Sequence, residues 1–249
     1  MSHKQRLDLL LVEKGLAASR QRARALIMAG KVLVDTLRLD KPGVQVSADA
    51  NICLKGEDSP YVSRGGLKLA GALEAMHLDV SGTVCMDVGA STGGFTDCLL
   101  QHGASRVYAV DVGYGQLAWK LRQDNRVIAI ERTNIRHMSS DAIPEPVDLI
   151  TIDVSFISLK IVVPAAMLFL KPSGTILALI KPQFEAGRGH VGKGGVVRKK
   201  EMHQRIISNL RDFFQDQGLI CGAVVPSSIL GPKGNQEFIV QLTRSDSVI

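Results

Sequence analysis

The chain has 249 residues, of which 45% are hydrophobic and 22% are charged. A chain of this length and apolar content can bury a sizeable core, which excludes disorder as its main state. The formal net charge of +6 favours an acidic partner such as a nucleic acid, although the excess is modest. Only 4% of the residues are aromatic, so a broad base-stacking surface is not expected.

The N-terminus and the cysteines favour a cytoplasmic protein. The first apolar run is broken by charge after four residues, and no later stretch approaches the ~20 apolar residues that cross a bilayer. No partner in a membrane is therefore expected. The four cysteines form no CxxC pair, so they are expected as small buried residues in a reducing compartment. His190 and His203 have no further ligand at a suitable spacing, so both are expected at the surface and no metal site is expected.

Residues 6–15 and 19–30 each have the pattern of a short amphipathic helix closed by a glycine. Ser19 is a suitable N-cap for the second helix. Gly15 and Gly30 suit the left-handed position just beyond each C-terminus. The pattern therefore predicts two short helices at the start of the chain.

Two short strands are expected after these helices, at 31–35 and 51–56, and residues 36–43 read as a turn between them. In the preceding helix, residues 25–27 are expected to face a core. Together these elements predict a small N-terminal domain of α+β type.

Cations gather on the second helix of this domain. Arg20, Arg22 and Arg24 lie within its first turn and a half, where an ordinary solvated helix face would also explain them. The stretch SRQRARALIMAGKVLV favours the other reading, because its spacing resembles the RNA-binding domain named after ribosomal protein S four. The resemblance covers roughly residues 4–57 and implies that the basic helix face contacts phosphates. The candidate RNA contacts of this domain are Arg6, Arg20, Arg22, Arg24 and Lys31.

From Tyr61 onward, apolar runs typical of strands alternate with helical stretches, which indicates a mostly parallel sheet wrapped by helices. The expected strands are 83–89, 106–112, 127–131, 147–154 and 174–180, and the expected helices are 66–78, 94–102, 114–122, 156–170 and 199–217. The runs at 219–229 and 237–243 follow with no helix between them, so they predict an antiparallel terminal hairpin. A seven-stranded, mostly parallel sheet that ends in such a hairpin is the α/β, Rossmann-like fold of class I methyltransferases. The expected domains are 1–58 and 66–249, joined by a linker at 59–65.

The segment MDVGASTGGFTDCLL reads as a strand, a glycine-rich turn and a helix. Gly89 and Gly93 allow tight turning and a close backbone approach to a ligand. Ser91 stands where a dinucleotide-binding loop needs its second glycine to admit a pyrophosphate. S-adenosylmethionine has no phosphate, so this loop favours it as the cofactor and disfavours an NAD-dependent oxidoreductase.

Three polar residues at strand ends could contact the same cofactor. Asp111 ends the second strand, eighteen positions after Gly93, where a carboxylate can accept hydrogen bonds from ribose hydroxyls. Asp87 ends the first strand and is placed to approach the amino-acid moiety. Asn134 follows the third strand and could reach the adenine. A structural role is left open for each of them, most of all for Asp87 and Asn134.

Charged residues also mark the later strands. The fourth strand ends in IDVSF and lacks the Asp/Asn-Pro-Pro-aromatic motif of many amino-group methyltransferases, which argues against an exocyclic base amine as acceptor. Lys181 directly follows the fifth strand, at the edge where ligands bind in this architecture. Glu237 begins the last strand. Lys68 lies on a helix whose buried face is expected to include Leu67, Ala70, Leu73 and Ala75.

Each of these charges alone could be a solvated side chain, but their order is specific. Lys68, Asp153, Lys181 and Glu237 resemble the K-D-K-E tetrad of FtsJ-type ribose 2′-O-methyltransferases. With SRGGLKL, DVGASTGGFTD, DVSFISL and KPQFE, nearly the whole chain resembles the TlyA (haemolysin A) family of bacterial rRNA 2′-O-methyltransferases. The resemblance implies methylation of cytidine ribose in 16S rRNA, 23S rRNA or both, with rRNA or ribosomal subunits as partners.

The chemistry suits these residue types. A ribose 2′-hydroxyl must lose its proton as it attacks the sulfonium methyl group. An ordinary lysine, with a pKa of about 10.4, is a poor base at neutral pH, but desolvation and a neighbouring cation lower such a pKa. We expect Lys181 to activate the hydroxyl, Asp153 to hold Lys181, and Lys68 and Glu237 to orient the ribose; whether Lys181 is a true base or a positioning group stays open.

Residues 185–200 are rich in glycine and cations, and Arg188 and Lys193 lie in this stretch. A mobile loop that closes over RNA is one hypothesis for it, and an ordinary surface loop is the alternative. Arg64 is a further candidate RNA contact or a linker residue. Two other functions remain as alternatives for the chain: a membrane-active haemolysin and a catalytically silent RNA-binding assembly factor.

Overall fold

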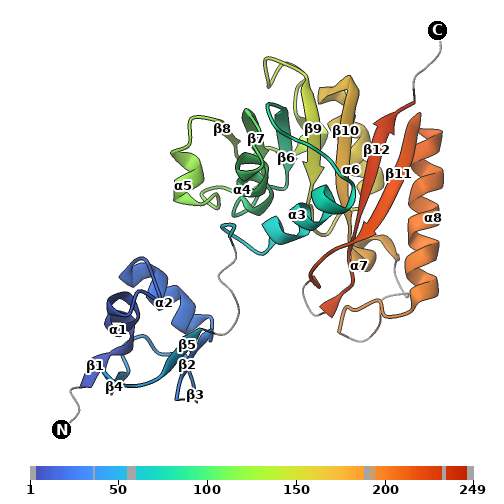
Figure 1. Cartoon of the computed structure of the whole chain (residues 1–249). Helices are drawn as coiled ribbons and strands as arrows, with labels where there is room; N and C mark the ends of the chain where they lie inside the picture. Colours follow the sequence, from blue (N-terminus) through green and yellow to red (C-terminus); the bar gives the residue numbers. More distant parts are fainter. Residues whose placement is uncertain are drawn as a thin grey trace. The chain divides into compact units, whose positions relative to one another are not determined.

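The computed structural model describes residues 4–35, 37–54, 60–187, 192, 194–231 and 234–245. The chain divides into two compact units, Met1–Asp58 and Ser59–Ile249 (Figure 1). Arg188, His190 and Lys193 lie outside the described residues, so the expectations for these three stay untested.

The described part of the first unit contains two helices and five short strands. These are β1 (Lys4–Arg6), α1 (Leu7–Glu13), α2 (Arg20–Met28), β2 (Val32–Val34), β3 (Leu37–Leu39), β4 (Gln45–Ser47) and β5 (Ile52–Leu54). Strand β2 pairs antiparallel with both β3 and β5, and β1 pairs antiparallel with β4. The two expected helices and the strands at β2 and β5 are confirmed.

The helix ends follow the sequence signals. The Ser19 hydroxyl accepts a hydrogen bond from the Arg22 N–H at 3.2 Å, as expected of an N-cap. Gly15 and Gly30 both have positive φ, which ends each helix in the left-handed conformation. The expected core face is partly wrong, because Ala23 is buried with Leu26 and Ile27 while Ala25 is exposed. Positions i, i+3 and i+4 share a helix face, which a run of adjacent residues cannot do.

Three strands of the first unit were not predicted. Strands β1, β3 and β4 read KQR, LRL and QVS and contain no apolar run, whereas the equally short β2 and β5 read VLV and ICL. Strand β3 lies inside the stretch 36–43 that was expected to be a turn only.

The second unit is built on one seven-stranded sheet. Its strands are β6 (Val84–Val88), β7 (Arg106–Val110), β8 (Val127–Ile130), β9 (Val147–Ile152), β10 (Leu170–Ile180), β11 (Leu219–Pro226) and β12 (Phe238–Arg244). They lie in the order β11-β12-β10-β9-β6-β7-β8 (Figure 1). The five strands β6–β10 pair in parallel, whereas β12 is antiparallel to both β10 and β11. The predicted mostly parallel sheet with a terminal antiparallel hairpin is confirmed.

The strand order reverses beside β6. From β6 the chain proceeds through β7 to β8 on one side, and through β9 to β10 on the other. The loops after β6 and β9 therefore diverge and open a crevice at the carboxyl edge, which is where ligands bind in open α/β sheets. Gly89 and Asp153 begin these two loops.

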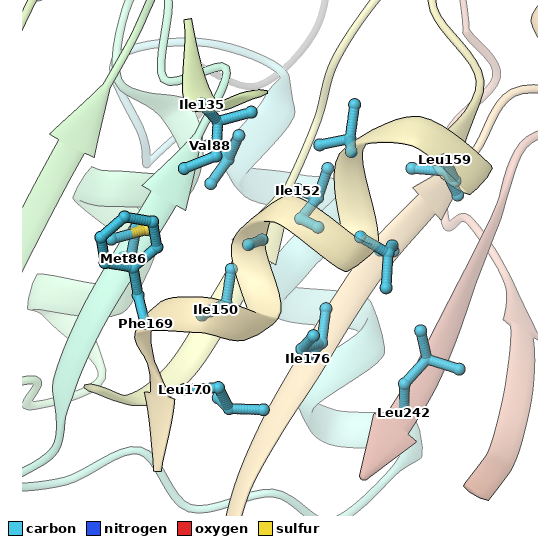
Figure 2. Packing of buried hydrophobic residues seen from close by; sticks show 14 of the residues in the cluster. Met86, Val88, Ile135, Ile150, Ile152, Leu159, Phe169, Leu170, Ile176 and Leu242 are labelled. Carbon is cyan, nitrogen blue, oxygen red and sulfur yellow. The ribbon is translucent and has the colours of Figure 1, made fainter. Parts of the chain in front are cut away.

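Helices cover both faces of this sheet. The main ones are α3 (Gly65–Ala75), α4 (Gly94–Gln101), α5 (Trp119–Arg122), α6 (Leu159–Ala166), α7 (Pro182–Glu185) and α8 (Lys200–Asp216). On one face, Met86, Ile150 and Ile176 of the strands pack with Leu159 and Phe169 (Figure 2). The other face has its own buried cluster, which includes residues of α3 and α4. Burial on both faces explains why the strands read as continuous apolar runs.

Two expected helices are shorter than predicted. Helix α5 begins only at Trp119, because the Gly113 and Gly115 N–H groups donate to the carboxylates of Asp111 and Glu131 instead of to a helix. Helix α6 begins only after Ser158, its N-cap. In the described part of the chain, no helix has the length and apolar character needed to span a membrane.

Candidate active site

Two adjoining cavities open at the carboxyl edge of the sheet. The first, of about 490 Å³, is lined by Lys68, Asp153 and Lys181 among others. The second, of about 520 Å³, is lined by residues that include Asp111 and Asn134. Both volumes are typical of small-molecule sites. The residues common to both cavities are Gly89, Ser91, Asp153 and Ser155, so groups held in the two cavities would meet at these residues.

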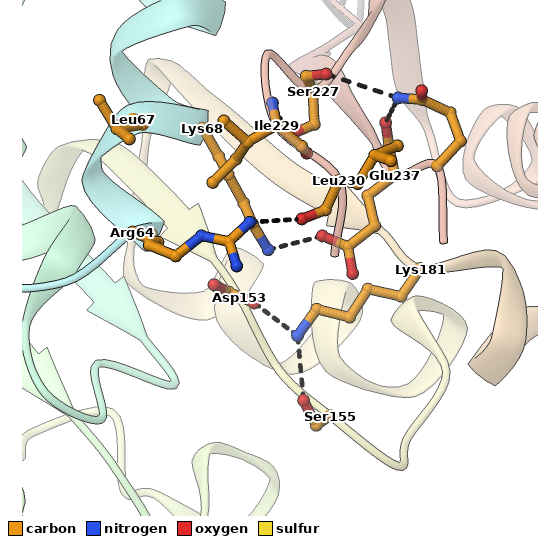
Figure 3. Close-up of polar contacts among 12 residues, drawn as sticks. Arg64, Leu67, Lys68, Asp153, Ser155, Lys181, Ser227, Ile229, Leu230 and Glu237 are labelled. Atoms are coloured by element: carbon orange, nitrogen blue, oxygen red, sulfur yellow. Dashed lines mark hydrogen bonds and ion pairs between the residues drawn. The ribbon is translucent and has the colours of Figure 1, made fainter. Parts of the chain in front are cut away.

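The four predicted tetrad residues form two ion pairs at the first cavity (Figure 3). The Lys68 Nζ donates to Glu237 Oε2 at 2.5 Å. The Lys181 Nζ lies 2.6 Å from Asp153 Oδ1. The residues come from helix α3, the end of β9, the end of β10 and the segment just before β12, so only the folded sheet brings them together.

Burial distinguishes the two pairs. Glu237 is fully buried and the Lys68 side chain is 10% exposed, whereas the Asp153 side chain is 21% exposed. Lys68 shares the buried face of α3 with Leu69, Ala72 and Leu73, while Ala75, expected on that face, is exposed. A buried lysine is tolerated only with a partner, and Glu237 is that partner.

One carboxylate oxygen of these pairs has capacity for a further hydrogen bond. Within the described residues, the buried Oε1 of Glu237 accepts no hydrogen bond, whereas Asp153 Oδ1 is paired with Lys181. Glu237 itself lines neither cavity, so Lys68 is the member of its pair that lines the first cavity, and Glu237 holds it there.

Ser155 and Phe156, which follow Asp153 in the chain, belong to the same site, although the sequence assigned no role to either of them. Lys181 Nζ donates to Ser155 Oγ at 3.0 Å, so the lysine is held from two directions (Figure 3). Phe156 has a positive φ of 65° and is 90% exposed, with its ring 4.9 Å from that of Phe184. The signal was present in the motif DVSFISL, whose residues after the aspartate had to lie at the same sheet edge.

The glycine-rich turn lines both cavities, and its residues Gly89 and Ser91 line the second one. Gly89 has φ of +85°, and a Cβ there would lie 2.6 Å from the Asp153 carbonyl oxygen, so only glycine fits. Asp111 accepts hydrogen bonds from the Ser91 N–H at 2.8 Å and the Gly113 N–H at 2.6 Å. A carboxylate has about four acceptor sites, so Asp111 can also accept from two ribose hydroxyls. Asn134 lines the same cavity.

Comparison with known proteins agrees with this geometry. The FtsJ-like methyltransferase family matches residues 61–244, and the S4 domain matches residues 5–52. The 16S/23S rRNA (cytidine-2′-O)-methyltransferase TlyA of Mycobacterium tuberculosis is 46% identical, covering 100% of this chain and 94% of that protein. The chain belongs to the TlyA family of FtsJ-like methyltransferases.

Solved structures resemble the chain as well. A protein of Streptococcus thermophilus, named as a haemolysin, is 44% identical with a TM-score of 0.77, covering 99% of this chain and 90% of that chain. An S-adenosylmethionine-dependent methyltransferase of Mesorhizobium loti has a TM-score of 0.52 at 15% identity, covering 70% of this chain and 96% of that chain. At that identity the likeness shows the fold alone.

Two of the expected cofactor contacts in this TlyA-family chain lie outside the lining of the second cavity. Gly93 ends the turn with φ of +95° and is packed against Leu117 and Leu121. Asp87 is fully buried, and its carboxylate accepts from the Thr96 N–H at 2.9 Å, the Thr96 hydroxyl at 2.7 Å and the Thr151 hydroxyl at 3.2 Å. Asp87 therefore fixes the start of α4, and with it the turn. Burial raises the pKa of Asp87 to about 7.

This raised pKa predicts a pH-dependent stability. An acid with a higher pKa in the folded state stabilises the fold below its unfolded pKa, here 3.8, and loses that contribution as the pH rises through about 7. Relative to Asp87→Asn, wild type is expected to lose roughly 4 kcal/mol of unfolding free energy between those limits. Urea unfolding across this pH range measures the difference. The exposed Asp216→Asn is the matched control, and parallel curves for wild type and Asp87→Asn would contradict the prediction.

The expected RNA contacts in the first unit lie on three elements. Arg6 ends β1, the other three arginines lie on α2, and Lys31 precedes β2. Arg6 and Arg20 both bind Asp8, at 3.0 Å and 2.9 Å, and Asp8 is fully buried. The hydrogen bond from Arg6 lowers the pKa of Asp8 to about 2. This shared carboxylate fixes the two guanidinium groups, and both keep exposed surface. The remaining candidates in this unit, Arg22 and Arg24, are exposed, and Lys31 is half-buried.

In the second unit, Val196 and Val197 are the buried residues in the described part of the stretch 185–200. Val197 is buried, its N–H donates to Asn235 Oδ1 at 3.0 Å, and its carbonyl oxygen lies 2.8 Å from His203 Nε2. His203 is buried, so the expectation that it lies at the surface is wrong; its position on the inner face of α8 explains this.

Arg64 donates to the Leu230 carbonyl at 2.9 Å beside the first cavity. The described residues hold no group of three metal-ligating side chains.

Proposed function

We propose that this chain transfers a methyl group from S-adenosylmethionine to the ribose 2′-hydroxyl of cytidine in 16S rRNA, 23S rRNA or both. The observation that carries the proposal is the position of the Lys181–Asp153 pair at the junction of the two cavities. One cavity would hold the methyl donor and the other the acceptor nucleotide. The printed activity of the TlyA relative from Mycobacterium tuberculosis supports the substrate.

The second cavity fits S-adenosylmethionine. Its volume suits a nucleoside ligand, Gly89 permits a close backbone approach, and Asp111 offers acceptors for ribose hydroxyls. Asn134 lies where the adenine would bind, and Ser91 lies on the wall shared with the first cavity. When bound, S-adenosylmethionine supplies the methyl group on its sulfonium sulfur.

The residues of the first cavity would then prepare the acceptor. In its neutral form the Lys181 amine accepts the proton of the 2′-hydroxyl, and the ammonium that forms is paired with Asp153, while Ser155 helps to keep the lysine in place. Lys68, which lines the first cavity, donates to the ribose, and the buried Glu237 holds Lys68 in position. Such alignment of donor and acceptor supplies much of the rate enhancement.

The same proposal assigns residues 1–58 to RNA binding, 59–65 to a linker and 66–249 to catalysis. The S4-domain match at residues 5–52 supports the first assignment. An rRNA substrate implies ribosomal subunits as the partner and the cytoplasm as the place of action.

The test is transfer of tritiated methyl groups to small subunits, large subunits and naked rRNA from cells that lack the enzyme. Ribose-linked label is expected, and nuclease digestion locates it. Asp111→Ala is expected to raise KM for S-adenosylmethionine about 10-fold or more, because two charge-assisted hydrogen bonds are lost. Asp124→Ala is the matched control, because Asp124 pairs with Arg126 away from both cavities.

Three outcomes would contradict the proposal. Label on a base would contradict ribose as the acceptor. No label despite measurable cofactor binding would favour a silent assembly factor. Lysis of red cells by the purified protein, without methyl transfer to RNA, would favour a membrane-active haemolysin.

A further inference from the structure

Large apolar side chains are exposed together on one segment next to the second cavity. The chain has a single tryptophan and three tyrosines. Trp119 is 71% exposed and Tyr114 is 68% exposed, and Val112 in the same segment is 70% exposed. Exposed apolar residues that gather in this way mark an interaction site more often than singly scattered ones do.

The segment is rigidly held. The Arg132 N–H donates to the Gly113 carbonyl at 2.9 Å, and the Gly115 N–H donates to Glu131 at 2.8 Å. Arg122 of helix α5 forms an ion pair with the same Glu131. The aromatic side chains therefore project from fixed backbone, which reduces the entropy lost when a partner binds.

Cations accompany the aromatic rings. The Arg132 guanidinium lies 4.2 Å from the centroid of the Tyr114 ring, and Arg132 itself has φ of +54°, a strained conformation for a residue with a side chain. Trp119 and Arg122 are three residues apart on α5 and so share a helix face. Arg122 contacts Glu131, which also binds the Gly115 N–H, so Glu131 ties helix α5 to the backbone beside Tyr114.

The segment also borders the proposed reaction site. It directly follows Asp111, and its residues Val112 and Gln116 line the second cavity. The Ala118 N–H donates to the Thr92 carbonyl in the glycine-rich turn at 3.1 Å. A partner that covers Tyr114 and Trp119 would therefore lie against the rim of the cofactor cavity.

We propose that Tyr114 and Trp119 form a platform on which unpaired bases of the RNA substrate stack. This inference rests on the proposed function and adds a contact outside the four tetrad residues. Aromatic faces beside arginine suit nucleotides, because bases stack on the rings while the guanidinium attracts phosphate. Of the acidic residues in contact with the segment, Glu131 is paired with Arg122 and Asp111 lines the second cavity, so the Arg132 guanidinium beside Tyr114 is placed to attract an anionic partner.

Because Trp119 is the only tryptophan, its fluorescence reports on the platform directly. The full chain is titrated with single-stranded oligocytidine RNA and, separately, with a fully paired RNA duplex of the same length. We expect the single strand to quench the fluorescence and the duplex to quench it far less. The affinities of the variants are measured by fluorescence anisotropy of end-labelled RNA, which does not depend on Trp119. Trp119→Ala is expected to weaken single-strand binding by about 5- to 150-fold, since stacking contributes about 1–3 kcal/mol per base. Trp119→Phe should retain most of the affinity, and Tyr114→Ala should lose affinity.

Leu168→Ala is the matched control, because Leu168 is also 68% exposed but lies on the turn Met167–Phe169. The proposal is overturned if single-stranded RNA leaves the fluorescence unchanged and Trp119→Ala binds it as wild type does. Concentration-dependent self-association that buries Trp119 without RNA would overturn it as well. Methyl transfer is measured in parallel: label on rRNA without quenching refutes the platform alone, and quenching without any label refutes the proposed function alone.

Discussion

Replacement of Lys181 by alanine is expected to lower kcat for methyl transfer by about 10²- to 10⁴-fold, the usual contribution of a positioned acid–base group. Lys181 Nζ is held by Asp153 at 2.6 Å and by Ser155 at 3.0 Å, at the wall that the two cavities share. Removal of the amine leaves the acceptor hydroxyl without its proton acceptor and without alignment. Lys181 does not line the second cavity, so binding of S-adenosylmethionine should stay close to wild type.

Single-turnover methyl transfer and calorimetric cofactor binding measure these two effects separately. Lys171→Ala is the matched control, because Lys171 also forms a lysine–aspartate pair, with Asp148 at 2.7 Å, but lines neither cavity. Ser155→Ala should give a smaller loss of kcat, since Asp153 still holds the lysine. A Lys181→Ala variant that retains kcat within tenfold of wild type would show that the lysine has no such role.

The sheet and most of the site could be predicted from local sequence patterns. Strands buried on both faces read as continuous apolar runs, and the polar residue at the end of each run lies at the carboxyl edge of the sheet. Asp111, Asp153 and Lys181 all follow such runs. The folded sheet therefore brings into contact residues that are far apart in the sequence.

Other features depend on tertiary packing and left no local signal. Strands β1 and β4 read KQR and QVS and contain no apolar run, whereas the equally short β2 reads VLV. The tetrad could be recognised, but its division into a buried pair and a partly open pair depends on how α3 packs against the segment before β12. Lys68 and Glu237 are separated by 169 positions, and each alone looks like a solvated charge. The buried state of Asp87 likewise follows from Thr96 and Thr151, which sequence reasoning did not connect with it.

Loss of the Glu237 carboxylate is expected to damage the fold as well as the activity. Glu237→Ala leaves the Lys68 ammonium, only 10% exposed, without its partner at 2.5 Å. Removing one partner of a buried ion pair costs about 3–5 kcal/mol of unfolding free energy. Urea unfolding measures this cost. Lys171→Ala, which removes one partner of a pair more than a third exposed, should cost at most about 1 kcal/mol.

A double variant separates the structural effect from the catalytic one. Lys68→Met/Glu237→Leu replaces the buried pair with apolar side chains of similar size, which is often neutral or stabilising by about 1–4 kcal/mol. We expect this variant to recover the stability that Glu237→Ala loses and to remain deficient in methyl transfer, because no ammonium is left at position 68 of the first cavity to orient the ribose. Recovery of both stability and activity would mean that the pair only fills space. Recovery of stability alone would mean that burying the two charges lowers the folding stability and that the pair is needed for the reaction.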